Sequence, residues 1–407
     1  MKKQNILSSR PLHPIQMGLF ILIELLLIFG ETFSKFNLYG FFYLYDTALF
    51  LLGLISVFYF IKQTNKDWNW PILVLLILSF LYLLYSYFIA HNPTNYIIRQ
   101  YALFIYLGLG WLIFSSFVNK QYQKYNVRFI VIIAIASVAL QIGYIMYLSV
   151  FTDGFSLFGN MNYFSKMSLV GTIIAGAYVM VFIKKPFYKW LFAIAYITLT
   201  TTLGHSSAFL GAFAIVVTYI ILQLPNKVKI AGAVIMGIAV LAFFLLLPQF
   251  SDDNAEWRLV FWKYSLKDII TNYYTVLGHG FGVPYPTQET LDALRENLNS
   301  PWFEVRPEEM YTSPMHNSFI TLAFHIGLLP SLIIFVPLIK PFKETFLTNS
   351  NLRNPQADFL ILSWVGLSVW SSFNVVLELP HTSAYIWLVY FSLVYQFRHS
   401  HHSDEEA

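Results

Sequence analysis

The residues best suited to chemistry in this sequence are a neighbouring histidine and asparagine, His316 and Asn317, which open an apolar run. Near neutral pH an imidazole is largely the free base, so it could accept a proton from a hydroxyl group. Ser313-Pro314, just before the pair, is typical of a helix start, with serine as the cap and proline at the first helical position. We therefore expect His316 and Asn317 in the first turn of a helix, where free backbone N–H groups attract an anion.

The spacing after this pair predicts one face of the same helix. Gly327 follows His316 after eleven residues, which at about 100° per residue is within about 20° of a whole number of turns. Pro330 lies near that face, whereas His325 points the opposite way. A neighbouring helix or a lipid chain could approach closely at Gly327. A lone helix histidine also fits a purely structural role, and the residues alone leave both interpretations open.

Residues 255–270 predict an amphipathic helix that lies on the outer membrane surface. Arg258 in its first turn could clamp an anionic ligand, because guanidinium offers a planar bidentate fork for phosphate. The alternative is a contact with solvent or with lipid phosphates. The apolar positions at helical spacing are Trp257, Phe261, Tyr264 or Ser265, and Ile269.

The glycine-rich run Gly278-His279-Gly280-Phe281-Gly282 has two interpretations. Its backbone N–H groups could cradle a phosphate. Its glycines could equally well only permit a turn with positive φ.

The elements that must position these residues are membrane helices. The chain has 407 residues, of which 57% are hydrophobic and only 11% charged, against about 25% charged in soluble domains. The net charge is +4, but the basic residues are scattered along the chain, which argues against nucleic acid as a partner. The chain has no cysteine, which excludes disulfides and thiolate metal sites. The run after Met1-Lys2-Lys3 lacks a cleavage site, so we expect a retained first helix.

We expect an all-α polytopic membrane protein with about twelve transmembrane helices. Lys and Arg gather in alternate connections, which places both termini in the cytoplasm. The expected parts are spans one to nine in 1–248, one long external loop with the amphipathic helix in 249–314, spans ten to twelve in 315–398, and a cytoplasmic tail in 399–407. The expected spans are about 14–30, 40–61, 70–90, 98–118, 128–149, 163–183, 188–203, 207–224, 230–248, 315–338, 358–376 and 383–397.

Ionisable groups within membrane spans are costly and by default suggest function. In this topology Glu24 and His325 lie deep, and the other groups lie in the outer half. For any one of these groups, an interfacial side chain that snorkels to water is the alternative. Together they predict a cavity that opens to the outside and is lined by cations and imidazoles. The groups in the outer half are Asp46, Arg99, Lys166, His205 and His316.

These residues resemble the O-antigen ligase and O-antigen polymerase (Wzy-like) superfamily of membrane glycosyltransferases. His316-Asn317, nine residues and Gly327 are similar to its signature, although Pro330 stands where a last glycine is expected. The helix Arg258–Trp262 followed by Gly278–Gly282 is similar to its Arg, Trp and Gly-x-Gly block.

Two further motifs extend the resemblance to about residues 150–340. Gly159-Asn160-Met161-Asn162 resembles the family's Gly-Asn-x-Asn turn. Thr202–Ala208 falls where the family often has Ser-Arg-Gly or Ser-Arg-Ala, so the arginine expected around Ser207 is missing.

The resemblance implies a glycosyltransferase with a GT-C-type membrane fold that uses a glycan on a polyprenyl diphosphate and needs neither metal nor nucleotide sugar. Inversion at the anomeric carbon is expected for a single direct displacement. By motif, His316 is the catalytic base and Arg258 binds the diphosphate. Arg99, Lys166 or His205 would replace the missing arginine, and a further family arginine corresponds to Arg295 or Arg306. The other expected substrate-binding residues are Asn317, Gly278, His279 and Gly280.

The function we predict is polymerisation of a surface polysaccharide, such as a capsule or exopolysaccharide, at the external face of the cell membrane. The expected partners are an undecaprenyl-diphosphate-linked oligosaccharide, the lipid bilayer, and a chain-length regulator and a flippase of the same pathway, with no cofactor. One alternative is an O-antigen-type ligase that moves the glycan to a lipid, protein or wall acceptor. A more distant alternative is a flippase or transporter of lipid-linked glycan, although the chain lacks an internal repeat and its long loop is not central.

Overall fold

The computed structural model describes residues 37–39, 42–62, 69–117, 166–202, 206–246, 253–271, 273–298, 306–348 and 353–398, with parts of 127–151. In these ranges the regular elements are helices apart from one antiparallel pair of very short strands, β1 (Asn37–Tyr39) and β2 (Phe42–Tyr43). The all-α expectation is therefore correct except for this pair. The expected first span at 14–30 and the tail at 399–407 lie outside the described residues.

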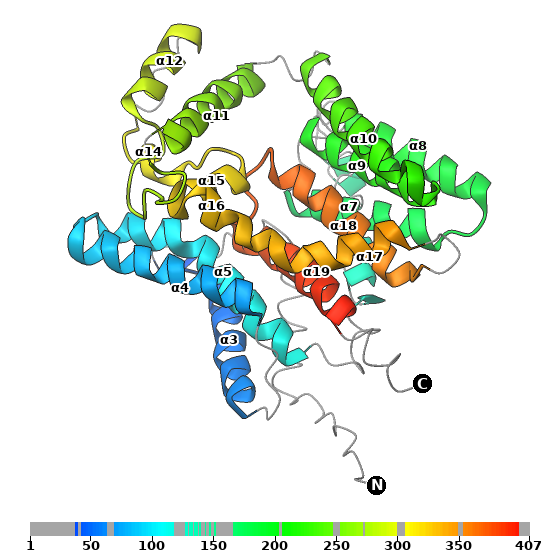
Figure 1. Ribbon diagram of the computed structural model, residues 1–407, viewed down its shortest axis with the longest axis horizontal. Helices are drawn as coiled ribbons and strands as arrows, with labels where there is room; N and C mark the ends of the chain where they lie inside the picture. Colours follow the sequence, from blue (N-terminus) through cyan, green and yellow to red (C-terminus); the bar gives the residue numbers. More distant parts are fainter. Residues whose placement is uncertain are drawn as a thin grey trace.

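Most of the expected spans that the structure describes contain one helix each. Between the N-terminal group (α3 to α5) and the group α7 to α10 lie α18 and α19 (Figure 1). The helices are α3 (Leu44–Lys62), α4 (Trp70–Leu84) with its π-helical continuation η1 (Tyr85–Ile89), α5 (Thr94–Phe117), α7 (Lys166–Phe182), α8 (Pro186–Thr202), α9 (Ser206–Gln223), α10 (Asn226–Leu246), α18 (Pro355–Ser371) and α19 (Pro380–Arg398).

Two described segments, Trp70–Ile89 and Thr94–Ile113, are long and apolar enough to cross a membrane. Leu49–Phe58, Val170–Phe182 and Ser207–Gln223 are apolar but shorter. Large apolar side chains are exposed on the outer faces of α3, α4, α8 and α10, as expected where lipid replaces water. The total of twelve spans stays a prediction.

The expected tenth span, 315–338, is wrong as a single helix. The chain forms α15 (Ser318–Ile326), breaks at Gly327 with φ 95°, and continues through α16 (Leu328–Ser331), the 3₁₀-helix η4 (Leu332–Leu338) and α17 (Ile339–Leu347). The break requires glycine, since a Cβ at Gly327 would lie 2.6 Å from the carbonyl oxygen of Val276 and φ is positive.

The two ends of α9 are held by different chemistry. At one end the carbonyl oxygen of Leu222 accepts a hydrogen bond from Arg353 Nη1 at 2.5 Å. At the other end Ser207 Oγ accepts one from Asn374 Nδ2 at 2.8 Å, and the Asn374 carbonyl accepts one from Ser318 Oγ at 3.2 Å. The 18 residues of α9 rise about 27 Å, close to the thickness of a hydrocarbon core. The segment that carries His316 therefore lies at the opposite end of α9 from Arg353.

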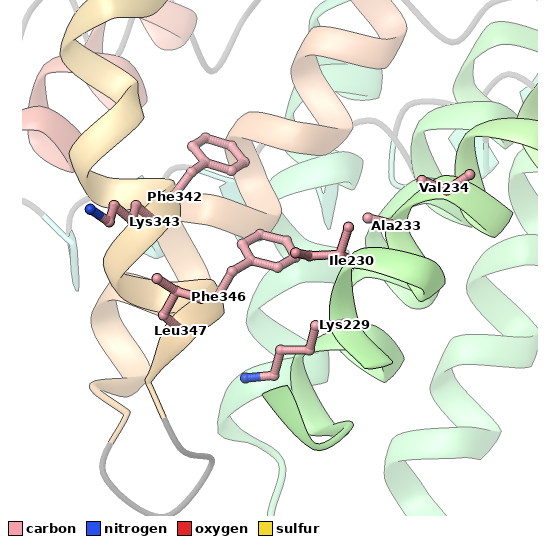
Figure 2. Close-up of a pocket in the computed structure, with 8 residues that line it drawn as sticks. All are labelled: Lys229, Ile230, Ala233, Val234, Phe342, Lys343, Phe346 and Leu347. Carbon is pink, nitrogen blue, oxygen red and sulfur yellow. The ribbon is translucent and has the colours of Figure 1, made fainter. Parts of the chain in front are cut away.

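A cavity of about 500 Å³ lies between α10 and α17, at the same end of the molecule as Arg353 (Figure 2). Its lining is mostly apolar, with Lys229 and Lys343 among the lining residues. Lys229 is buried, and its Nζ donates to the Thr348 carbonyl at 3.1 Å. Because Thr348 and Arg353 flank the same connection, this cavity is remote from His316 and is not the candidate site.

Candidate active site

The segment between α10 and α15 forms α11 (Asp253–Thr271), α12 (Gln288–Leu298) and α14 (Glu309–Thr312), which lie beside α15 and the ends of α4 and α5 (Figure 1). The amphipathic helix forms as expected, but it does not lie with its apolar face on a membrane. Phe261, Ser265 and Ile269 are buried, and this face packs on α12 and α15 with Phe324 in the same apolar cluster. Of the two expected alternatives, Ser265 and not Tyr264 lies on the inner face.

His316 does not lie in the first turn of a helix, which corrects the expected helix start at Ser313-Pro314. Ser313 ends α14, and α15 begins only at Ser318 with Asn317 as its N-cap. The Asn317 Oδ1 accepts hydrogen bonds from the N–H groups of Phe319 and Ile320, both at 3.1 Å. These two N–H groups are therefore satisfied by the protein itself and are not free for an anion.

The backbone of His316 is in the left-handed region, with φ 51°. Non-glycine residues seldom adopt this conformation, which costs on the order of 1 kcal/mol or more and is concentrated at functional sites. The His316 N–H closes a tight turn onto the Pro314 carbonyl at 2.7 Å. His316 therefore lies in the turn between α14 and α15, just outside the helix.

Helix α11 places Trp257, the neighbour of the expected site residue Arg258, against His316. The Trp257 ring meets the His316 imidazole edge to face, with centroids 5.2 Å apart and an interplanar angle of 80°. The half-buried Arg258 has its guanidinium carbon 5.9 Å from the same Trp257 ring. Trp262 fixes the approach, because its Nε1 donates to the Met315 carbonyl at 2.5 Å. Trp257 therefore links the imidazole to the guanidinium group.

The structure supports the turn interpretation of the Gly278–Gly282 run. Gly280 and Gly282 have φ values of 81° and 75°. All five N–H groups bond within the protein, to Tyr82 Oη, the Phe324 carbonyl, the His325 carbonyl, Ser86 Oγ and Gln100 Oε1. A phosphate would have to displace these bonds, so the structure gives Gly278, His279 and Gly280 a packing role in place of the expected cradle.

The His279 side chain is likewise engaged within the protein. Its ring is stacked between Tyr274 and Phe324, with centroid distances of 3.7 Å and 4.2 Å. Its Nε2 lies 2.8 Å from Asp268 Oδ2 on α11. His325 is fully buried, with Nδ1 2.7 Å from the Gly280 carbonyl and Nε2 3.3 Å from Tyr285 Oη. Both histidines join the glycine run to the helices around it.

Arg99 and Arg306 lie on the side of the site formed by α5 and α14. The neighbouring Gln100 fixes this side, because its Nε2 donates to the carbonyls of Val283 and Tyr311 at 2.8 and 3.0 Å. Arg99 is exposed, and its positive charge favours a lower pKa for Tyr285. Arg306 is exposed and pairs with Glu309 at 3.3 Å.

The remaining expected residues are only partly within the described chain. Lys166 begins α7, but its side chain is not described. His205 lies outside the described residues, as does Gly159–Asn162. Arg295 is on α12, where it pairs with Asp292 at 2.8 Å in an exposed ion pair.

Sequence reasoning missed Glu378, which lies in the connection between α18 and α19. Its Oε2 accepts hydrogen bonds from Ser318 Oγ at 2.6 Å and from the Val376 N–H at 3.1 Å. Burial raises the pKa of this carboxyl above its ordinary value. Burial also raises the pKa of Tyr285. The charge of Glu378 raises this pKa further, whereas the charge of Arg99 lowers it. The signal in the sequence was a single carboxylate between two apolar runs.

Apolar helices with imidazole, guanidinium and carboxyl groups at one end are typical of the class of membrane-embedded enzymes. Residues 190–335, from α8 to η4, match the family model described as O-Antigen ligase. The match includes Arg258 and His316 and supports membership of the O-antigen ligase and polymerase family of membrane proteins. No curated protein matches the chain.

Proposed function

We propose that this chain transfers a glycan from a polyprenyl diphosphate to a sugar hydroxyl at the external face of the cell membrane. The observation that carries the proposal is the contact of His316 with Trp257, whose ring also lies 5.9 Å from the guanidinium carbon of Arg258. An imidazole supplies the base that a sugar hydroxyl needs, and a guanidinium group supplies the charge that a leaving diphosphate needs.

In the proposed reaction, His316 removes the proton from the acceptor hydroxyl as its oxygen attacks the anomeric carbon. The bond from that carbon to the diphosphate oxygen breaks, and the diphosphate leaves with its charge near Arg258. Arg99 and Arg306 are the further candidates for the diphosphate, with Asn317, His205 and Lys166 for other parts of the substrate. A single displacement inverts the anomeric centre, and the fold is proposed to be of the GT-C type with both termini in the cytoplasm.

The acceptor that we favour is another repeat unit on undecaprenyl diphosphate, which makes the chain a polymerase of surface polysaccharide. The description of the matching family as O-Antigen ligase supports the second candidate, a ligase with a lipid, protein or wall acceptor. The glycan pattern after gene deletion separates them. Loss of the chain-length ladder indicates a polymerase, whereas an intact but unattached ladder indicates a ligase.

The test of the chemistry is in vitro glycan transfer by purified protein with His316→Ala. We expect a loss of at least about a hundredfold, the usual contribution of a general base. The matched control is His91→Ala, because His91 also has a left-handed backbone, with φ 53°, but lies between α4 and α5. Wild-type activity should survive chelation of divalent metals. Undiminished transfer by His316→Ala would remove the proposed base.

A further inference from the structure

An apolar turn, residues 273–277, follows α11 and displays large side chains outward. Tyr273 is 87% exposed, Val276 54% and Leu277 61%, and Ile270 at the end of α11 is 59% exposed. Residues 269 to 278 contain no charged side chain. So much exposed apolar surface on one short turn indicates an interaction site.

The turn is held in one conformation. Tyr273 has φ 64°, and its carbonyl accepts the Val276 and Leu277 N–H groups at 3.3 Å. Thr275 Oγ1 donates back to the Ile269 carbonyl at 3.1 Å, and the Thr275 carbonyl accepts the Leu329 N–H at 2.9 Å. The apolar side chains are therefore presented by a fixed backbone.

The depth of this turn follows from its contacts with α4. Gly278 N–H donates to Tyr82 Oη at 3.1 Å, and Phe281 N–H donates to Ser86 Oγ at 2.8 Å. The N–H groups of His279 and Gly280 bond to the carbonyls of Phe324 and His325, whereas the Thr275 carbonyl accepts from Leu329, further along the chain from α15. The turn therefore lies further from the start of α15 than residues 279 and 280 do, level with Tyr82 or deeper. Tyr82 precedes Ile89, the end of the membrane-length segment Trp70–Ile89, by seven residues, which is about 10 Å along a helix.

A segment of 20 residues rises about 30 Å, the thickness of the hydrocarbon core. A depth of about 10 Å below its end therefore lies among acyl chains and not among headgroups. The apolar turn also continues a surface of exposed side chains on α4 and on α16 and η4. These neighbours are Leu81, Tyr85, Leu329, Leu332 and Val336.

We propose that the apolar turn is a membrane anchor whose side chains insert among the acyl chains of the external leaflet. The other face of the same segment differs in chemistry, since α12 exposes Glu289, Asp292, Arg295 and Glu296. In this proposal the segment between α10 and α15 has one face exposed to water and one face exposed to lipid. This surface is independent of the proposed glycan transfer, and only its assignment to the external leaflet rests on the proposed orientation.

The experiment uses the fact that the chain contains no cysteine, so every introduced thiol is unique. Val276→Cys and Leu277→Cys are labelled with a nitroxide in the full-length protein, in vesicles of phosphatidylcholine and phosphatidylglycerol. Collisions with oxygen, which concentrates in hydrocarbon, are compared with collisions with a water-soluble nickel chelate. Leu81→Cys on α4 is the lipid-facing reference, and Glu296→Cys on α12 is the aqueous reference.

The anchor predicts that labels at 276 and 277 resemble the label at 81, with an oxygen-to-nickel ratio about tenfold above that at 296, because a charged chelate is excluded from hydrocarbon. Nickel collisions as frequent as at 296 would place the turn in water and overturn the proposal. Low collision rates with both reagents would mean that protein covers the turn, in a second copy or a partner, and would overturn it as well.

Discussion

At the scale of single residues, His316 joins a left-handed backbone to an aromatic contact with Trp257. Only glycine adopts this backbone without a steric cost, so a histidine there is retained at the expense of stability. The neighbouring Asn317 explains part of the motif differently, since it caps α15. The pair thus combines a chemical group with a structural one.

A comparison of His316→Gly with His316→Ala isolates the backbone, because both variants lose the imidazole. We expect the glycine variant to be more stable by about 1 kcal/mol, since alanine keeps the left-handed cost. Both variants should be inactive. Thermal unfolding in detergent measures the difference, and the same pair at Glu296 on α12 should show the opposite order. Equal stabilities at position 316 would mean that its backbone is not strained.

Glu378 predicts a stability that depends on pH. Burial raises the pKa of its carboxyl above the ordinary 4.5, so ionisation is harder in the folded than in the unfolded chain. The free energy of unfolding therefore falls as pH rises from below 4.5 through the raised pKa. Each unit by which the pKa is raised in the folded state lowers this free energy by about 1.4 kcal/mol. Glu378→Gln should be more stable than the wild type at pH 8, with a gain that disappears near pH 4. A gain that is constant across this range would contradict the assignment.

At the scale of elements, the site depends on the close approach of two breaks in the chain. A Cβ at Gly278 would overlap the His325 carbonyl, and Gly327 meets the Val276 carbonyl with a positive φ. Neither glycine tolerates a side chain without displacement of backbone. His316 and Gly327 therefore flank the short helix α15 at its two ends. The prediction that they share one face of a long helix is wrong.

Gly278→Ala and Gly327→Ala should each destabilise the protein by about 2 kcal/mol or more, through overpacking against backbone and, at Gly327, through positive φ. The control is Gly237→Ala in α10, where a Cβ meets nothing within 4 Å. This variant should be neutral or slightly stabilising, because alanine favours a helix. Thermal unfolding of the three variants checks the order, and a harmless Gly278→Ala would contradict the packing.

The sequence predicted the helices better than their ends. The amphipathic pattern from Trp257 to Ile269 predicted α11 because its period is local. The break at Gly327 could not be predicted, since membrane helices tolerate glycine and proline when neighbours satisfy the backbone. The chain around the break makes tertiary contacts with residues 275 and 276, which lie far away in the sequence. The inner position of Ser265 was likewise undecided until α12 and α15 were in place.

At the scale of the whole molecule, the length of α9 separates the connection that carries Arg353 from the candidate site. Arg353 binds the Leu222 carbonyl at one end, and Ser207 reaches Ser318 through Asn374 at the other. The residues around Ser207 were predicted to lie near the substrate from the resemblance alone, and this link places Ser207 next to the start of α15. Glu378 was missed because a lone carboxylate in a short connection has no recognisable spacing.

The proposed orientation predicts which thiols are accessible from outside intact cells. Single cysteines at Glu296 and Arg306 should react with a membrane-impermeant maleimide, whereas cysteines at Lys184 and Lys343 should react only after permeabilisation. All four side chains are exposed, so burial does not explain a difference. Labelling of Lys343→Cys in intact cells would reverse the topology.

The nine residues of α15 rise about 14 Å, half the depth of a hydrocarbon core, and backbone that stops there cannot be hydrated by bulk water. Its last carbonyls, Phe324 and His325, accept the N–H groups of His279 and Gly280, and Leu329 N–H returns to Thr275. If the segment between α10 and α15 opened as a lid, these peptide groups would lose their hydrogen bonds within the hydrocarbon core. Each unpaired group would cost several kcal/mol. In the proposed topology this segment is therefore a fixed plug, and glycans must enter and leave around its flanks.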